Sequence, residues 1–154
     1  MSHYVAKVLQ PGETVAFEGT IHWLVYLPAI LFAVIALAGV VMIVGSAEDS
    51  RLFGEAIFAF GAIFGVIAFL RAWFARFTTE IAVTDKRVIF KRGFIRRQTV
   101  EMNMSKVESV DVDQSILGRI FDYGDILVRG TGAGLEPLKM IAHPLAFRNA
   151  VIAH

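Results

Sequence analysis

Two long apolar runs occupy the first half of the chain. The first extends from Trp23 to Val44 without a charged residue, and the second extends from Leu52 to Phe74. At about 1.5 Å per residue, a helix over the first run is long enough to cross a hydrocarbon core of about 30 Å. We therefore expect a transmembrane hairpin within residues 21–76, with spans at 23–44 and 52–74.

The segment between the two runs is short and polar, from Gly45 to Arg51, and so forces the two helices to be antiparallel. The uncharged core of the second run is only 56–70, so we expect Glu55 and Arg71 close to the two membrane interfaces. A cleaved signal peptide is disfavoured, because mostly polar residues precede the first run and a second run follows it. Two buried helices of a soluble protein are disfavoured too, because the first run has no polar face.

The charges that flank the two runs predict the orientation of the hairpin. Arg51 is the one basic residue of the linker, whereas six basic residues lie beyond the uncharged core of the second run: Arg71, Arg76, Lys86, Arg87, Lys91 and Arg92. Cytoplasmic flanks of membrane helices collect Lys and Arg. We therefore expect a multi-pass membrane protein with both termini in the cytoplasm.

Small and aromatic residues within the hairpin have expected roles. Gly61 and Gly65 form a small-xxx-small pair, which allows close helix approach. Packing within the hairpin is the favoured interpretation, and a dimerisation face is the alternative. Trp23, Tyr26 and Trp73 have the composition and position of interfacial anchors.

Alternating polar and apolar residues flank the hairpin. In the segment 1–20, period-2 alternation follows the Pro11-Gly12 turn and predicts a short strand that can dock on the C-terminal domain. Over residues 77–154, short strand patterns predict an α+β fold, a small barrel or sandwich capped by a terminal helix that begins at Pro144. The strands are expected at 79–84, 87–91, 94–103, 107–113, 125–130 and 135–141, with one or two helical turns at 114–121.

The composition agrees with a membrane segment joined to a polar domain. The hydrophobic content is 56% and the mean hydropathy is +0.61, which is too apolar for an ordinary soluble domain. Residues 1–70 carry a net charge of −3, whereas residues 71–154 carry +4. The chain has no cysteine, which excludes disulfides, cysteine-ligated metals and a thiol nucleophile.

The C-terminal half resembles the bacterial pleckstrin-homology family bPH2. The resemblance covers 78–151 and is carried by the Thr84–Ile89 turn, the Arg92-Gly93 hairpin, the Val107–Val112 strand leading into Gln114-Ser-Ile-Leu-Gly118, and Gly130-Thr-Gly132. It implies a PH-like fold, two helices ahead of the domain, a bacterial cytoplasmic (inner) membrane location and a tendency to self-associate. His143 stands where such members usually carry an acidic residue before the proline.

No reactive constellation is evident in the sequence. The four histidines, at positions 3, 22, 143 and 154, form no i, i+4 metal-binding pair, and there is no G-x-S-x-G motif. The glycine-rich segment 130–134 lacks the Lys-Ser/Thr of a phosphate-binding loop. We therefore expect no catalytic residue, no metal, no cofactor and no small-molecule substrate.

A basic cluster follows the hairpin and is the most prominent polar feature. Such clusters beside a membrane attract anionic lipid, but a topology signal combined with charged protection of strand edges is the favoured interpretation. We do not expect nucleic-acid binding, because Phe90 and Phe94 are predicted to pack inside. The candidate lipid-headgroup residues are Arg71, Arg76, Lys86, Arg87, Lys91, Arg92, Arg96 and Arg97.

These patterns favour a non-catalytic membrane-anchored interaction or scaffold domain at the cytoplasmic face. Membrane lipids and a protein partner are expected, the latter a second copy of the chain or a larger complex in which the chain is an accessory subunit. The alternative is an anionic-lipid-sensing domain that uses the Lys86–Arg97 basic cluster. An enzyme is the third hypothesis, without a residue to support it.

Overall fold

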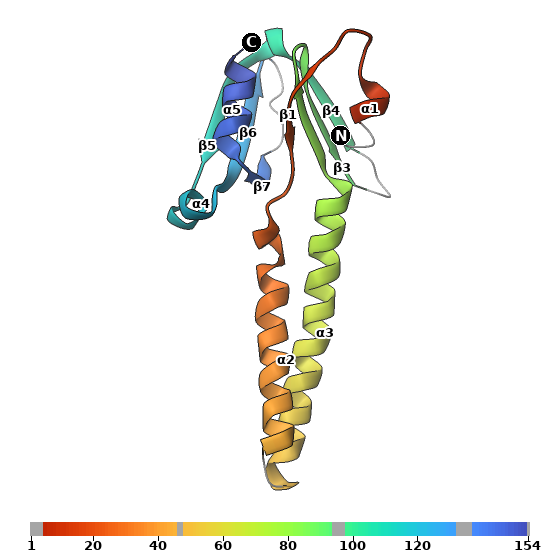
Figure 1. Cartoon of the computed structure of the whole chain (residues 1–154), viewed down its shortest axis with the longest axis vertical. Coiled ribbons are helices and arrows are strands. Elements are labelled where there is room, and N and C mark those ends of the chain that lie inside the picture. Colours follow the sequence, from red (N-terminus) through yellow and green to blue (C-terminus); the bar gives the residue numbers. More distant parts are fainter. Residues whose placement is uncertain (1–4, 46–47, 94–97, 132–136, 154) are drawn as a thin grey trace. The chain divides into compact units, whose positions relative to one another are not determined.

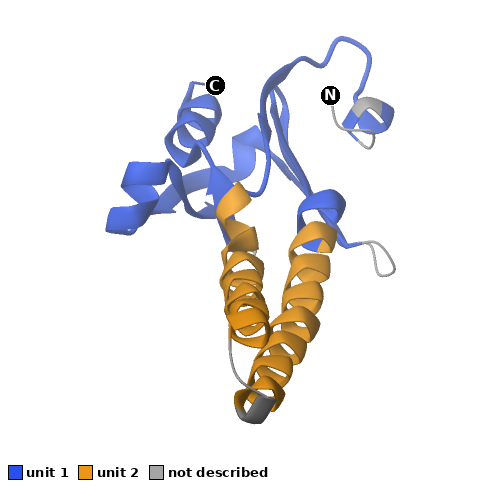
Figure 2. Cartoon of the chain, turned by 60° about the horizontal axis from the view of Figure 1, so that its bottom comes forward, with its two compact units in different colours: residues 1–22, 75–154 blue, residues 23–74 orange. Residues whose placement is uncertain are grey.

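The computed structural model describes residues 5–45, 48–93, 98–131 and 137–153, which fall into two compact units. Residues 1–22 and 75–154 form one unit, which we call the β domain. Residues 23–74 form the other, which we call the hairpin (Figure 2). The N-terminal segment therefore belongs to the same unit as the C-terminal half.

The hairpin consists of two long helices that pack side by side (Figure 1). A 3₁₀ turn, η1 (Trp23–Tyr26), leads into α2 (Leu27–Gly45), and α3 (Glu48–Thr78) continues into the β domain. Both helices are long and apolar enough to cross a membrane, and only 11% of the most apolar stretch of each helix is buried. Most of their large apolar side chains are exposed, unlike those of a core helix in a soluble protein.

Four strands form the first antiparallel sheet, in the order β1-β2-β3-β4. They are β1 (Val15–Gly19), β2 (Glu80–Thr84), β3 (Arg87–Arg92) and β4 (Gln98–Asn103). Although the hairpin separates β1 from β2 in the sequence, the two strands pair directly. The hairpin is thus an insertion between two neighbouring strands, and it connects the end of β1 to the start of β2, which lie side by side.

Three strands form the second antiparallel sheet: β5 (Val107–Asp113), β6 (Tyr123–Gly130) and β7 (Leu138–Ala142). A short 3₁₀ helix, η2 (Met104–Lys106), joins the sheets, and α4 (Ile116–Phe121) connects β5 to β6. The two sheets are also linked by an isolated bridge between Ile21, which follows β1, and Ile141 of β7. Of the expected barrel or sandwich, the barrel is therefore wrong: over the described residues, no ladder joins β4 to β5, because η2 breaks the extended backbone there.

The terminal helix α5 (Pro144–Ile152) covers the core between the sheets and confirms the predicted α+β arrangement. It contacts strands of both sheets, β1 and β2 on one side and β5 and β6 on the other. Phe147 is fully buried, and its ring meets Phe17 of β1 edge-on with centroids 6.0 Å apart. Val151, one turn later, is also buried. The spacing of these two residues is the apolar stripe of an amphipathic helix.

A four-residue helix that the sequence pattern did not predict, α1 (Val5–Val8), covers the other face of the first sheet. Val5 forms a buried cluster with Ala82 of β2 and Ile89 of β3. Since the neighbouring residues Ile81, Val83 and Val88 are buried as well, these strands are buried on both faces. This explains why their sequences are nearly continuous apolar runs instead of alternating ones.

Candidate functional site

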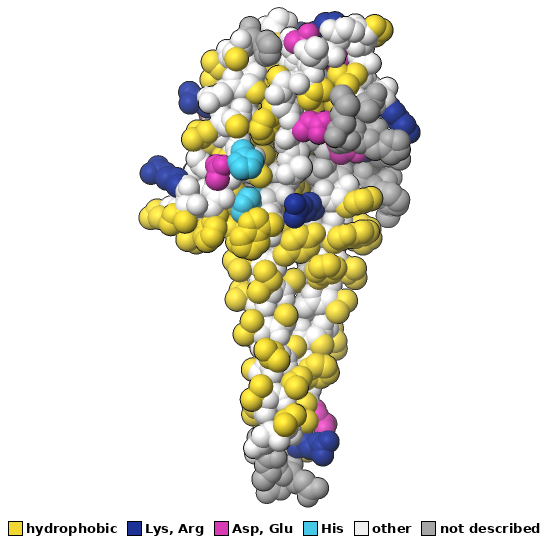
Figure 3. All heavy atoms as spheres, viewed as in Figure 1, with side chains coloured by type: hydrophobic (Ala, Val, Ile, Leu, Met, Phe, Trp, Pro, Cys, Tyr) yellow, Lys and Arg dark blue, Asp and Glu magenta, His cyan; other side chains and the backbone are white. Residues whose placement is uncertain are grey.

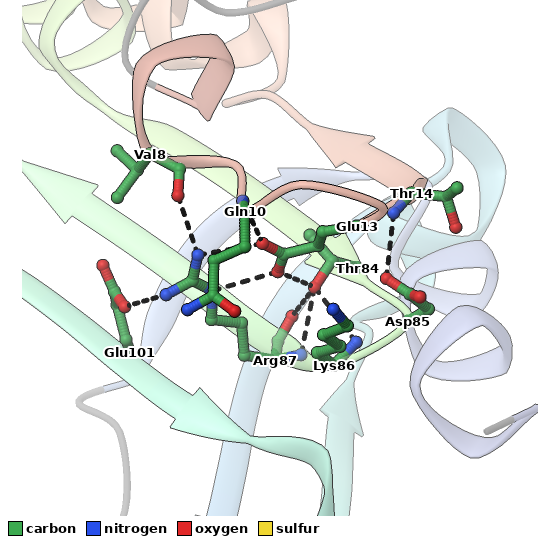
Figure 4. A network of polar contacts seen from close by, with 9 residues as sticks. All are labelled: Val8, Gln10, Glu13, Thr14, Thr84, Asp85, Lys86, Arg87 and Glu101. Carbon is green, nitrogen blue, oxygen red and sulfur yellow. Dashed lines mark hydrogen bonds and ion pairs between the residues drawn. The ribbon is translucent and has the colours of Figure 1, made fainter.

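A buried carboxylate joins the N-terminal segment to the turn between β2 and β3 (Figure 4). Glu13 follows the Pro11-Gly12 turn and accepts hydrogen bonds from Arg87 Nε at 3.0 Å and Arg87 Nη2 at 2.9 Å. The Thr84 hydroxyl donates to the same carboxylate at 2.7 Å. The Glu13 side chain is completely buried. Charge and hydrogen bonds are therefore matched inside the domain, as a buried ion requires.

Arg87 completes this arrangement, which we call the Glu13 network and which comprises Glu13, Thr84, Arg87 and Glu101. Its Nη1 donates to Glu101 of β4 at 2.7 Å, and its Nη2 also donates to the carbonyl of Val8 at 2.8 Å. The guanidinium thus ties together α1, the segment before β1, and β4. These contacts raise the pKa of Arg87, with the Glu13 hydrogen bonds the largest cause.

The Glu13 network decides the charge state of Glu13. Burial alone would raise the pKa of this carboxyl group, because it removes water from the charged form. Hydrogen bonds from Arg87, the Gln10 backbone and Thr84, together with the Arg87 charge, outweigh burial and lower the pKa to about 2. Glu13 is therefore ionised under ordinary conditions and serves the fold instead of acting as a proton donor.

The structure does not gather the candidate lipid-binding residues into one exposed site. Arg87 is buried in the Glu13 network, and Lys91 pairs with Glu80 at 2.8 Å with both side chains 15% exposed. Lys86 and Arg92, near the two ends of β3, are exposed. Arg71 and Arg76 of α3 are exposed too, whereas Arg96 and Arg97 lie outside the described residues. Lipid contact by the exposed members stays a prediction.

A groove runs along β5, between this strand and α5. Two adjoining hollows of about 750 and about 460 Å³ share Val110, Asp111 and Arg148, and together they follow β5 over its whole length. We call them the β5 groove. β5 is an edge strand, and among the described residues it pairs with β6 alone. The groove therefore lies beside a strand with an open edge.

Polar side chains line the β5 groove without forming a catalytic constellation. Glu108 and Asp111 are exposed, and Asp111 pairs with Arg129 of β6 at 2.8 Å. In the parts of the chain that the structure describes, no group of three His, Cys, Asp or Glu residues could hold a metal ion. The expectation of no catalytic activity stays a prediction.

Two histidines lie at the end of the domain where the chain leaves for α2. The His22 ring stacks on Tyr123 with centroids 5.3 Å apart, and His143 Nδ1 lies 2.5 Å from a carboxylate oxygen of Asp122. Burial lowers the pKa of His22, and the nearby His143 lowers it further. A neutral His22 fits its role as a packed aromatic ring.

Glycines set the contact between the two helices of the hairpin. A Cβ on Gly61 would lie 2.5 Å from the backbone nitrogen of Ala36, so only glycine fits there. Gly65 has ordinary contacts, the nearest at 3.4 Å. Gly39 and Gly54, which the sequence analysis did not single out, approach as closely, since a Cβ on Gly39 would lie 2.8 Å from the Gly54 oxygen. Gly61 thus lies at the contact between α3 and α2 within the hairpin.

The three expected interfacial anchors lie at the same end of the hairpin. Trp23 and Trp73 are 47% and 41% exposed. Tyr26 is half-buried and packs against Phe69, with ring centroids 5.6 Å apart. Exposed tryptophans at one end of an apolar helix pair are typical of a membrane–water boundary, and their anchoring role stays a prediction.

Comparison with protein families gives one match. A family model described as a bacterial PH domain matches residues 22–151. The match includes both helices of the hairpin and every strand after β1, so the family's pattern extends well beyond the segment 78–151. Comparison with curated proteins and with solved structures found no match.

Proposed function

Because the chain belongs to the bacterial PH domain family, we propose that it is a non-catalytic interaction domain anchored at the cytoplasmic face of the bacterial inner membrane. The β domain binds an extended segment of a protein partner in the β5 groove, and the hairpin holds the domain at the membrane. The partner is a larger membrane complex that the chain serves as an accessory subunit, or a second copy of the chain.

The exposed apolar surface of the hairpin supports membrane anchoring. Leu31, Val34, Leu37 and Val41 of α2 are between 57% and 64% exposed. Surfaces of this kind are rare on soluble monomers, where they mark contact with lipid or protein. The excess of basic residues after α3 over the single Arg51 of the linker supports a cytoplasmic β domain.

The open edge of β5 beside its groove is the observation that carries the interaction role. An edge strand presents unpaired backbone groups, and an extended segment can add to it as a further strand. The opposite edge of this sheet is less suited, because the Ala142 amide of β7 donates to Thr20 and Met140 accepts from His22. Among the described residues, the sheet therefore offers its free edge at β5.

Site-specific photocrosslinking of the full-length chain in its native membrane tests this role. A photoreactive residue in place of Ser109, in β5, should give a defined protein adduct, because it would lie against the bound segment. The matched control replaces Lys139 of β7, which is also exposed, and should give none. Mass spectrometry of the adduct distinguishes a second copy from another protein. Absence of an adduct at residue 109, or equal adducts at both positions, would contradict the proposal.

Anionic-lipid sensing remains the alternative function, supported by the exposure of Lys86 and Arg92 while Arg87 and Lys91 are paired internally. Replacing both exposed residues with glutamine would then weaken binding of anionic lipid to the full chain in nanodiscs. Unchanged lipid binding would exclude this alternative.

A further inference from the structure

Helix α4 carries its apolar side chains on the outside of the β domain. Ile116, Leu117, Ile120 and Phe121 are 80%, 57%, 69% and 44% exposed. A surface helix ordinarily turns such residues toward the core. Figure 3 shows apolar side chains gathered at this side of the domain, near the two histidines. A contiguous exposed apolar patch marks a contact with a partner or a membrane.

Gly118 fixes this outward arrangement. A Cβ at residue 118 would lie 2.6 Å from the carbonyl oxygen of Tyr123. Gly118 therefore lies on the side of α4 that packs against β6. Ser115 accepts a hydrogen bond from the Gly118 amide at 3.1 Å, and Gln114 donates to the Gly118 and Tyr123 carbonyls at 3.3 and 3.1 Å. The bulky residues of α4 are therefore held facing away from the domain.

The end of α4 borders the point where the chain leaves the β domain. His22, the last residue of the domain before Trp23, stacks on Tyr123 and hydrogen-bonds the backbone of Phe121. Its amide donates to the Met140 carbonyl of β7 at 2.7 Å. His22 is thus fixed both to the end of α4 and to the sheet.

We propose that α4 inserts its apolar side chains into the membrane interface, at the boundary between lipid headgroups and acyl chains. The proposal rests on the proposed anchoring: if a membrane span begins at Trp23, the end of the domain that holds His22 faces the bilayer, and α4 with it. The membrane is therefore the surface that the apolar side chains of α4 would contact. Arg119, the charged residue of α4, is exposed, so its long stem would let the guanidinium reach lipid phosphates.

Single-cysteine labelling tests the proposal, since the natural chain has no cysteine. Full-length Ile120→Cys, Ala16→Cys and Leu37→Cys variants each carry an environment-sensitive fluorophore in vesicles of phosphatidylcholine and phosphatidylglycerol. Ala16 is the control, because it is exposed in β1, away from the hairpin end of this strand, and Leu37 reports on the hairpin, where it is 62% exposed. Quenchers are brominated lipid and aqueous iodide.

The label at residue 120 should lose fluorescence to brominated lipid and resist iodide, as the label at residue 37 does, whereas the label at residue 16 should show the reverse. An iodide-accessible label at residue 120 with a lipid-quenched label at residue 37 would overturn α4 docking and leave the anchoring intact. Protection of residue 120 from both quenchers would overturn it in favour of a protein contact. Iodide access at residue 37 would overturn the anchoring, and α4 docking with it.

Discussion

Glu13 is a charged residue buried inside the β domain. Its carboxylate receives two hydrogen bonds from Arg87 and one from Thr84, and its side chain has no contact with solvent. Loss of one partner of a buried ion pair leaves the other charge uncompensated, which costs about 3 kcal/mol or more. The Glu13 network is therefore a structural lock between the N-terminal segment and the β2–β3 turn.

We expect Glu13→Gln to lower the free energy of unfolding by about 3 kcal/mol, because it leaves the Arg87 charge partly unpaired in the interior. The measurement is urea unfolding of the full chain in detergent micelles, followed by the circular dichroism of the β domain. Glu108→Gln, at an exposed position of β5, is the matched control and should change stability little. Equal stability of the two variants would contradict the structural role of Glu13.

The lowered pKa of Glu13 predicts that the free energy of unfolding depends on pH in the acid range. Its pKa is about 2 in the folded chain and 4.5 as the ordinary value, so the native state favours the deprotonated form. The resulting stabilisation, of about 3 kcal/mol, is complete above pH 4.5 and is lost as the pH falls toward 2. The stability difference between the natural chain and Glu13→Gln should shrink over this range. A difference that stays constant from neutral pH to about pH 2 would contradict the lowered pKa.

The sequence could not identify the Glu13 network, because its partners are far apart in the chain. Glu13 and Arg87 are separated by 74 residues, and the hairpin lies between them. Local charge pattern placed Arg87 and Lys91 with their exposed neighbours in a lipid-binding cluster, since pattern alone does not tell a paired cation from a free one. The one signal was indirect: the alternation after Pro11-Gly12 predicted a strand able to dock on the domain, and β1 does pair with β2.

At the scale of elements, periodicity predicted most of the β domain. The expected strand at 107–113 coincides with β5, and the expected helix from Pro144 is α5. The sequence pattern did not reveal two features of the domain, for physical reasons. α1 has only four residues, too few to show a helical period, and the break between the sheets at η2 depends on backbone geometry that a strand pattern does not reveal.

The glycine contacts of the hairpin give a prediction at the same scale. Gly61→Ala should destabilise the full chain in detergent by about 1–3 kcal/mol, because the added methyl group collides with the backbone of α2. Gly45→Ala is the matched control, since a Cβ there meets nothing within 4 Å. Thermal unfolding of both variants makes the comparison. A Gly61→Ala variant as stable as Gly45→Ala would show that the helices do not pack at this glycine.

For the whole molecule, the central feature is that an apolar hairpin is inserted between two paired strands of a PH-like domain. Because β1 and β2 are neighbours, the two ends of the hairpin join the sheet at adjacent strand ends. Such a connection suits a domain held close to a membrane by two covalent links. In this account, the fold itself supplies the anchor, and the β5 groove remains available for a partner.

Cysteine accessibility in intact bacterial cells tests this account most directly. A membrane-impermeant maleimide should label a Ser50→Cys variant, at the start of α3 beside the linker, without permeabilisation. It should label Thr99→Cys, on the exposed side of β4, only after the inner membrane is opened. Labelling of both positions in intact cells, or of Thr99→Cys alone, would contradict a transmembrane hairpin that holds the β domain at the cytoplasmic face.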